Sequence, residues 1–529
     1  MRLRTSYPTS NSARTSLGLA ILLLICGAAA QAQVAETWLH ATPIEASDTW
    51  RSSRLLSMGD LSLTPDERAY RFSAFEYGGN PAGLLGSRDT SWVEQGTEYA
   101  DFHNEYYGQA HSAIVRRSGF RGAIDASKKW ALGVEFTYSS LLTSRHDEFT
   151  VPDNARFIRD FDLPFASSSQ PITSDRTFGA GVRYPVVAVN YARRVRSWLT
   201  LGLRYGYRDE TEKRKLLDAY DLDASARATE YVGGAVIRLP GLRDKAMLSA
   251  FGRYVNNIVL AQSKTPLNDD KYEWKRPEAG YGAQLLLRTK LFRAVMDARH
   301  RSYDGEQVAR INWAPQFYLN PFPSETDPNF VFRRRWSSFL SGFRHNEAST
   351  LWQIDLPGLP AHVGAEYAVY RDFQWIRPNP DVFQMSLPLD VRRLGYRAGG
   401  GVSLDLPDGE GAVATEVHMA RDFRADLTGA LPDIATSTLS YHFGGEYRAL
   451  AQLPLRAGVV LLRQDPDRRD GLPPNKGIQF TAGVGYFWNA LNAQVDLSGS
   501  HEHFRFSPLD PSAEIGYGDR MILTFTRLF

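Results

Sequence analysis

The densest group of residues able to do chemistry is His501-Glu502-His503, near the end of the chain. Two histidines at positions i and i+2 share one face of a β-strand, so both imidazoles could bind one metal ion. Zinc sites use at least three protein ligands, however, and no third ligand stands beside this pair in the sequence. The sequence therefore predicts neither a metal site nor a cofactor.

The sequence also lacks the motifs of common catalytic sites. It contains no nucleophile elbow, HExxH, glycine-rich phosphate loop or Ser-x-x-Lys set in a supporting context. Its formal net charge is +2 with both signs interspersed, a pattern that does not fit a nucleic-acid partner. We therefore expect neither an enzyme nor a nucleic-acid binder, with a hydrolase active at the rim of a barrel as an alternative.

A candidate ligand site lies in the segment 305–344, where we expect a long loop. Nine of its 40 residues are aromatic, against 12% of the whole chain. This density implies burial, as packing in the barrel mouth or against a bound ligand. An acidic amphipathic molecule such as a fatty acid could place its tail on the rings and its head on guanidinium groups, which bind carboxylates bidentately. The candidate ligand-binding residues are Trp313, Phe317, Phe322, Arg333, Arg334, Arg335 and Trp336.

Alternating strands must position these residues. From Trp130 to Ser139 every second residue is apolar and the others are small or polar, and the pattern recurs at 199–208 and 491–498. Such segments run about 10–16 residues with Trp or Tyr near their ends, longer than strands of soluble proteins. No apolar stretch long enough for a helical span follows the N-terminal region. We predict an all-β protein, a closed antiparallel transmembrane β-barrel, with a soluble sandwich as the alternative.

Short connections give the strand number, because outer-membrane barrels have short turns at one end and longer loops at the other. The short connections imply about 18 strands, with 14 or 16 as alternatives. A second long loop is expected at 144–174. The expected short turns lie near Lys128-Lys129, Arg194–Arg196, Leu239–Lys245, Thr289-Lys290, Leu356–Pro360, Leu406–Gly411, Leu453-Pro454 and Trp488-Asn489.

The polar side of these strands should line the barrel interior, since a charge facing lipid at mid-depth costs about 2–4 kcal/mol. Both signs occur, so we expect a wet wall cross-linked by salt bridges. The residues expected to face the lumen include Glu135, Arg204, Arg208, Arg293, Asp297, Arg299, Glu366, Glu416, His418 and Asp496.

Residues 1–32 have the pattern of a cleaved signal peptide. Three arginines precede the apolar run Leu17–Ala30, and Ala30-Gln31-Ala32 forms a small-x-small cleavage site. The single cysteine, Cys26, lies inside this segment, so the remaining chain would have neither a disulfide nor a thiolate metal site. The expected destination is a bacterial outer membrane, with membrane lipid as a partner.

The C-terminal end is an alternating segment that finishes on Phe529, with Phe525 at an equivalent position. A terminal Phe closing such a strand resembles the signal read by the outer-membrane barrel assembly machinery, which the resemblance makes a further partner. Arg527 stands where that pattern usually has an apolar or aromatic residue.

Residues 33–88 show no sustained alternation and precede the barrel region, 89–529. A stretch of this length is too long for a simple tail and predicts an N-terminal hatch or plug. The stretch contains Asn80-Pro81-Ala82, flanked by glycines. This motif in a hatch before a barrel with a terminal Phe resembles the FadL/TodX family of outer-membrane channels for long-chain fatty acids and other hydrophobic compounds. Members of that family typically have about fourteen strands, fewer than the turns imply here.

The resemblance implies an outer-membrane channel that passes or captures a hydrophobic small molecule. A barrel that conducts nothing and instead displays loops or docks partners is the alternative from the class of binding proteins. Conductance in planar bilayers would separate these two classes.

Overall fold

The protein is described from a computed structural model. The structure describes residues 53–64, 80–85, 91–106, 109–126, 129–151, 172–216, 220–239, 241, 245–264, 269–289, 291–312, 334–378, 389–407, 410–427, 434–467, 475–505 and 515–529. The expected signal peptide, 1–32, and most of the expected hatch lie outside these residues. Both therefore stay predictions.

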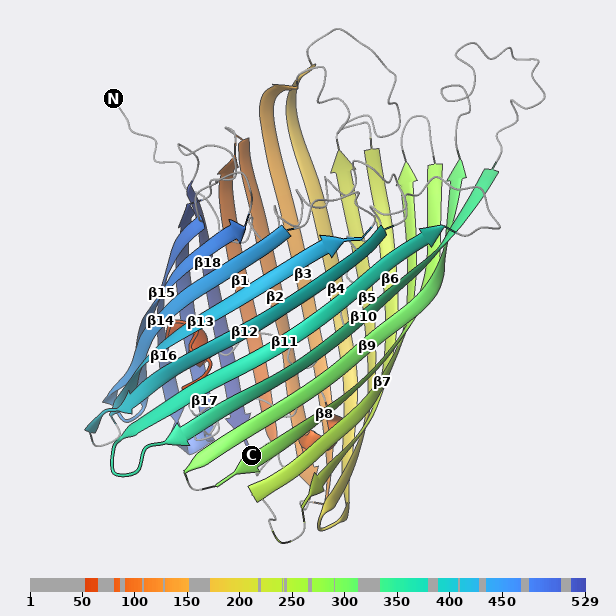
Figure 1. Ribbon diagram of the computed structural model, residues 1–529. Helices are drawn as coiled ribbons and strands as arrows, with labels where there is room; N and C mark the ends of the chain where they lie inside the picture. Colours follow the sequence, from red (N-terminus) through yellow and green to blue (C-terminus); the bar gives the residue numbers. More distant parts are fainter. Residues whose placement is uncertain are drawn as a thin grey trace, which may run out of the picture.

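A single antiparallel sheet closes on itself to form the barrel (Figure 1). It has 18 strands, which confirms the predicted fold and strand number, and it is larger than the resemblance to the FadL/TodX family implies. The seam is formed by β1 and β18, which pair from Trp92 opposite Leu528 to Asn104 opposite Gly516. The strands are β1 (Trp92–Tyr106), β2 (Gln109–Ala126), β3 (Trp130–Val151), β4 (Ile172–Arg196), β5 (Leu199–Leu216), β6 (Tyr220–Arg238), β7 (Ala246–Lys264), β8 (Asp269–Arg288), β9 (Phe292–Asn312), β10 (Arg334–Asp355), β11 (Ala361–Pro378), β12 (Leu389–Asp405), β13 (Gly411–Asp426), β14 (Ile434–Leu450), β15 (Leu453–Asp467), β16 (Asn475–Trp488), β17 (Ala493–Arg505) and β18 (Ile515–Leu528).

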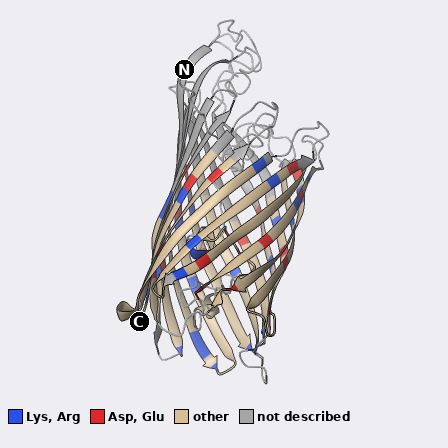
Figure 2. Cartoon of the chain, turned by 90° about the vertical axis from the view of Figure 1, so that its left-hand side faces the viewer, with Lys and Arg blue, Asp and Glu red and all other residues tan. Residues whose placement is uncertain are grey.

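The apolar side of each strand faces outward and the polar side faces the lumen. In β3, Val134 is 44% exposed on the outside, whereas its neighbour Glu135 is 3% exposed on the inside. A soluble sandwich would bury its apolar side, so this arrangement excludes it. Charged residues of both signs are spread along the strands (Figure 2), and all ten residues expected to face the lumen occupy inward positions in the strand register. Of the helices described, none is long and apolar enough to cross a membrane.

The predicted short turns are confirmed with two exceptions. β4 continues to Arg196 and β5 begins at Leu199, so the turn is Ser197-Trp198 and Arg194–Arg196 belong to the strand. The second exception is the Leu453-Pro454 step. β14 ends at Leu450 and β15 begins at Leu453, so the turn is Ala451-Gln452 and the Leu453-Pro454 step belongs to the strand. The register shifts between Arg448 and Leu450 beside the proline. A proline is tolerated at such an irregular strand end, because it has no N–H to give to the ladder.

The two expected long loops are shorter than predicted, which corrects both ranges. β3 continues to Val151 and β4 begins at Ile172, while β9 continues to Asn312 and β10 begins at Arg334. Above the apolar band a strand has no lipid-facing side, so its residues need not alternate. Strand pairing therefore continues there without the sequence pattern that reveals it.

Candidate functional site

Two pieces of the expected hatch lie inside the barrel against its inner wall (Figure 1). The α3 segment, Ser53–Thr64, contains the short helix α3 (Ser53–Ser57) and packs on β15–β18. The η2 segment, Asn80–Leu85, contains the 3-10 helix η2 (Pro81–Leu84) and packs on β3–β6. Both contact inward-facing wall residues near the short turns.

Asn80 fixes the η2 segment to the wall. Its side-chain oxygen accepts a hydrogen bond from the Ala82 N–H at 3.0 Å, which caps η2. Its amide nitrogen donates to the Ser249 hydroxyl at 2.8 Å and to the Ala250 carbonyl oxygen at 3.0 Å. Asn80 is only 1% exposed, so all of these bonds are shielded from water. Asn80 also donates to the Ala235 carbonyl oxygen at 3.0 Å, so the Asn80-Pro81-Ala82 motif anchors the η2 segment to strands β6 and β7.

A small apolar core forms where the η2 segment meets the barrel seam. Leu84 and Leu85 are buried together with Trp92 and Leu528, which pair with each other at one end of the seam between β1 and β18. Three inward-facing alanines of β2, β3 and β4 complete the cluster: Ala123, Ala131 and Ala192. Small wall residues leave room for the leucines, so the η2 segment and the seam bury their apolar surface against each other.

Glu416 of β13 holds the α3 segment. Its carboxylate accepts hydrogen bonds from the N–H groups of Ser62 at 2.9 Å and of Leu63 and Thr64 at 2.8 Å. The Thr64 hydroxyl donates to the same carboxylate at 2.8 Å. Successive backbone N–H groups pointing at one carboxylate form a strong, charge-assisted anion site. Because Glu416 is 0% exposed, this contact fixes the backbone of the α3 segment against the wall.

Two histidines extend this anchor. His418 lies 3.0 Å from Glu416 and 3.2 Å from Glu366, both measured from ring nitrogen to carboxylate oxygen. His442 donates to the Gly59 carbonyl oxygen at 2.7 Å. The two imidazoles meet edge to face, with ring centroids 4.7 Å apart. The wall of β11, β13 and β14 therefore binds both donors and acceptors of the α3 segment.

Glycines in the wall allow the backbones of the α3 and η2 segments to approach closely. A Cβ added at Gly444 would lie 2.0 Å from the Met58 carbonyl oxygen, and one added at Gly202 would lie 2.1 Å from the Ala82 nitrogen. No side chain fits at such distances. The wall is therefore shaped to receive these two segments.

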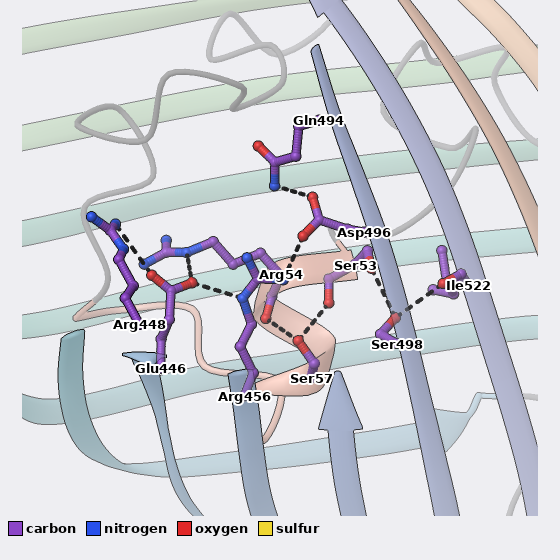
Figure 3. A network of polar contacts seen from close by, with 10 residues as sticks. All are labelled: Ser53, Arg54, Ser57, Glu446, Arg448, Arg456, Gln494, Asp496, Ser498 and Ile522. Atoms are coloured by element: carbon purple, nitrogen blue, oxygen red, sulfur yellow. Dashed lines mark hydrogen bonds and ion pairs between the residues drawn. The ribbon is translucent and has the colours of Figure 1, made fainter. Parts of the chain in front are cut away.

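A polar network joins α3 to three strands (Figure 3). Arg54 of α3 and Arg456 of β15 both donate to Glu446 of β14, at 3.1 Å and 2.7 Å. Arg456 also donates to Asp496 of β17 at 2.5 Å, and the Ser53 hydroxyl donates to Ser498 at 3.0 Å. The Arg456 side chain is fully buried. A buried charge of this kind needs all of its partners, because an unpaired one is strongly destabilising.

A second buried network lies in the wall of β3, β5, β6 and β7. Arg204 pairs with Glu135 at 3.0 Å and with Glu230 at 3.1 Å, and Arg253 pairs with Glu230 at 2.6 Å. Together with the network of Figure 3, these pairs confirm the expected salt-bridged wall.

Farther from the short turns, the inner wall of β9–β12 carries rings and arginines. Phe343 stacks between Tyr303 and His345, with centroid distances of 5.9 Å and 6.3 Å. The Arg301 guanidinium lies 5.9 Å from the Phe343 centroid. On the neighbouring strands, Arg393 lies 5.2 Å from the Tyr370 ring. This lumenal surface combines flat apolar faces with cations, the residue types expected of the ligand loop.

The candidate ligand-binding residues are only partly placed. Trp313, Phe317, Phe322 and Arg333 lie outside the described residues. Arg334, Arg335 and Trp336 are the first residues of β10 and pair with Asn312, Ile311 and Arg310 of β9, so they belong to a strand and not to a loop. For these three residues the structure describes the backbone and not the side chains. The backbone places all three farther along β10 than the lumenal ring of Phe343.

The histidine pair lies outside the lumen. His501 and His503 occupy outward positions of β17, and His501 lies 2.8 Å from Asp519 of β18. Within the described ranges, no three His, Cys, Asp or Glu residues are grouped to hold a metal ion.

The C-terminal residue completes the seam. The Phe529 N–H donates to the Ser91 carbonyl oxygen at 2.8 Å, and the Phe529 ring is 62% exposed on the outside. The Arg527 guanidinium stacks on this ring, 4.7 Å from its centroid. The unusual arginine therefore supports the terminal aromatic residue through a cation–π contact.

Deletion of Phe529 is expected to lower the yield of folded barrel, because it removes the terminal aromatic ring and one hydrogen bond of the seam. The heat-modifiable mobility of the barrel on a gel measures this yield. Leu359→Ala serves as the control, because it truncates an exposed apolar side chain in the turn between β10 and β11, far from the seam. A folded yield equal to that of the full chain would contradict the assembly role of Phe529.

Sequence reasoning located the Asn80 motif but missed the other anchors. Strand alternation places Glu416 in the lumen but does not reveal its contacts with the α3 segment. No sequence pattern points to Arg54 or to the helix α3. The available signal was the set of glycines at inward positions of β14, β15 and β16, where small residues mark a close backbone approach.

Comparison with known proteins finds no matching family model and no similar curated protein. Among solved structures, the chain is similar to the Pseudomonas putida toluene transporter TodX, with 11% identity and a TM-score of 0.36 over 90% of this chain and 98% of that chain. It is also similar to the Ralstonia pickettii toluene transporter TbuX, with 12% identity and a TM-score of 0.33 over 91% and 99%. The Bordetella pertussis alcaligin outer membrane receptor FauA matches with 9% identity and a TM-score of 0.40 over 83% and 76%.

These similar structures include members of the family that the Asn80 motif resembles. Likenesses this distant carry no argument about what this chain transports or binds. The function must therefore be inferred from its own residues.

Proposed function

We propose that this protein is an outer-membrane channel for hydrophobic small molecules, and that an N-terminal hatch fills part of its lumen. The observation that carries the proposal is the anchoring of the α3 segment by Glu416, inside a closed barrel with an apolar outer face. A barrel of about this strand number encloses an aqueous channel unless something fills it. A segment held in the lumen by a few polar contacts can be removed without opening the barrel.

The substrate class follows from the surface beyond the hatch. Phe343 and Tyr303 offer apolar faces, and Arg301 beside them offers a cation. Arg334 and Arg335 lie farther along β10, beyond this surface, and Arg335 is on the same side of the strand register as Phe343. An amphipathic acid, with an apolar tail and a carboxylate, matches both kinds of group. We propose a fatty-acid-like ligand.

Replacement of Arg333, Arg334 and Arg335 together by Gln is expected to weaken binding of a long-chain fatty acid by roughly tenfold or more, since hydrogen bonds to charged groups are the strong ones. Binding of the neutral methyl ester should change little. Fluorescence displacement on the purified, folded barrel measures both affinities.

The matched control replaces three arginines near a short turn, Arg193, Arg194 and Arg196, by Gln. It removes the same charge at the opposite end of the barrel and should leave both affinities unchanged. If the unmodified protein binds neither molecule, or if the first variant binds both as well as before, the fatty-acid-like ligand is wrong.

A further inference from the structure

The outward face of β10, β11 and β12 carries exposed arginines directly beyond its apolar band. In β11 the outward residues run from Val363 through Tyr367 and Val369 to Arg371. Arg344 of β10 and Arg392 of β12 occupy outward positions at a similar height, and all three arginines are exposed. This row lies where a membrane surface would meet water.

Aromatic rings hold two of these guanidinium groups in place. Arg344 and Arg392 are both in register with Phe373, which stands between them on β11, so their Cα atoms are about 10 Å apart. The Arg392 guanidinium lies 5.4 Å from the Phe373 centroid, and the Arg344 guanidinium lies 5.4 Å from that of Trp375. The two rings stack at 5.0 Å. Trp375 lies flat across Gly342, where any Cβ would collide with the indole.

These arginines differ from outward arginines elsewhere on the barrel. Arg227 lies 3.7 Å from Asp209, and Arg463 lies 2.9 Å from Asp465, with all four residues at outward positions. In the part of the chain that the structure describes, Arg344, Arg371 and Arg392 have no carboxylate within ion-pair distance. The acidic residue at an outward position of these three strands is Asp390, in register with Trp375. On the neighbouring strand β9, Asp304 is exposed at an outward position in register with Gly342. Three arginines beside these two carboxylates leave an excess of positive charge.

We propose that Arg344, Arg371 and Arg392 bind the phosphate headgroup of a lipid in the surrounding leaflet, whose acyl chains pack on the apolar band below. A guanidinium stacked on a ring still presents its N–H edge, which matches phosphate oxygens bidentately. Stacking also restricts the arginine side chain before binding, so less conformational entropy is lost when the lipid arrives.

A lipid fits this surface better than a soluble anion does. Tyr367, Val369 and Leu394 lie at outward positions next to the arginines and are 36–53% exposed, so an acyl chain would cover them. Burial of that apolar surface adds to the affinity in proportion to the area covered. The proposal rests on the membrane location of the proposed function, but not on conduction. A barrel that conducts nothing could still bind the lipid.

The test compares two lipids with identical acyl chains, phosphatidic acid and diacylglycerol, which differ by the phosphate. Native mass spectrometry of the full-length barrel in detergent counts the lipids bound at each concentration. Phosphatidic acid should bind about tenfold or more tightly than diacylglycerol, because charge-assisted hydrogen bonds add to the same apolar contact. Equal binding of the two lipids would overturn the proposal, and this comparison needs no variant.

The double variant R344Q/R392Q should lose this preference, while R463Q, an outward arginine that has its own carboxylate, should keep it. Unfolded protein is excluded by heat-modifiable mobility. Retention of the full preference in R344Q/R392Q would overturn the assignment to these residues. A large molar excess of inorganic phosphate should displace little phosphatidic acid. Complete displacement would show that the site recognises free phosphate and not a lipid.

Discussion

Removal of residues 33–73 is expected to leave a folded barrel that conducts ions roughly severalfold better than the full chain, since barrels of this size enclose an aqueous channel when nothing fills them. The deletion removes the α3 segment with its bonds to Glu416 and Glu446. It leaves the anchor of Asn80 and all strands of the barrel. Single-channel recording in planar bilayers measures the conductance, and heat-modifiable mobility reports folding. An unchanged conductance would place the segment outside the conducting path.

A disulfide between Ser53→Cys and Ser498→Cys provides the opposite control. The two hydroxyl oxygens are 3.0 Å apart, close enough for a disulfide after a small shift. The only native cysteine lies in the expected signal peptide, so no other thiol would compete. Oxidised protein should keep the low conductance. Reduction of the disulfide should return the conductance to that of the protein without the cross-link. The pair Ser53→Cys and Ser500→Cys, one inward position farther along β17, should not cross-link.

Replacement of Arg456 by Met is expected to destabilise the barrel by about 3–5 kcal/mol, because it leaves buried carboxylates without their cation. Glu446 keeps its ion pairs with Arg54 and Arg448. Of the contacts drawn in Figure 3, Asp496 keeps the hydrogen bond from Gln494. The midpoint of urea unfolding in lipid vesicles, followed by tryptophan fluorescence, measures the change.

The matched control is Arg463→Met, whose partner Asp465 is 44% exposed and whose own side chain is 55% exposed. Such surface pairs contribute at most about 1 kcal/mol, so its midpoint should move little. Adding Asp496→Asn to Arg456→Met should recover part of the loss by removing one unpaired charge. Equal midpoints for Arg456→Met and Arg463→Met would contradict the role assigned to the network.

The barrel could be predicted from the sequence because a strand that crosses a membrane must alternate apolar residues with polar or small ones. Each strand that crosses the apolar band alternates, as from Trp130 to Ser139, and each short turn is marked by polar, glycine or proline residues. Where a strand leaves the band, that constraint ends. The upper parts of β3, β4, β9 and β10 therefore escaped prediction, although their pairing is continuous.

The site was less predictable than the fold because its contacts join distant parts of the chain. Asn80 could be singled out through a local motif. Glu416 could be assigned to the lumen by alternation, yet nothing nearby in sequence shows that it receives the N–H groups of Ser62, Leu63 and Thr64. The helix α3 has only five residues, too few to be stable by local propensity, so its position depends on its contacts with the wall.

The anchors of the α3 segment also constrain the order in which the protein matures. The segment precedes β1, but its partners are 352 residues away at Glu416 and 445 residues away at Ser498. The first part of the hatch to be synthesised therefore has no place to dock until nearly all of the chain has been delivered. Contacts of such long range form late, after the strands that carry them. A nascent chain stopped before β13 would present an uncovered segment of Leu56, Met58, Leu61 and Leu63, a mark by which proteases could distinguish unfinished molecules from finished ones.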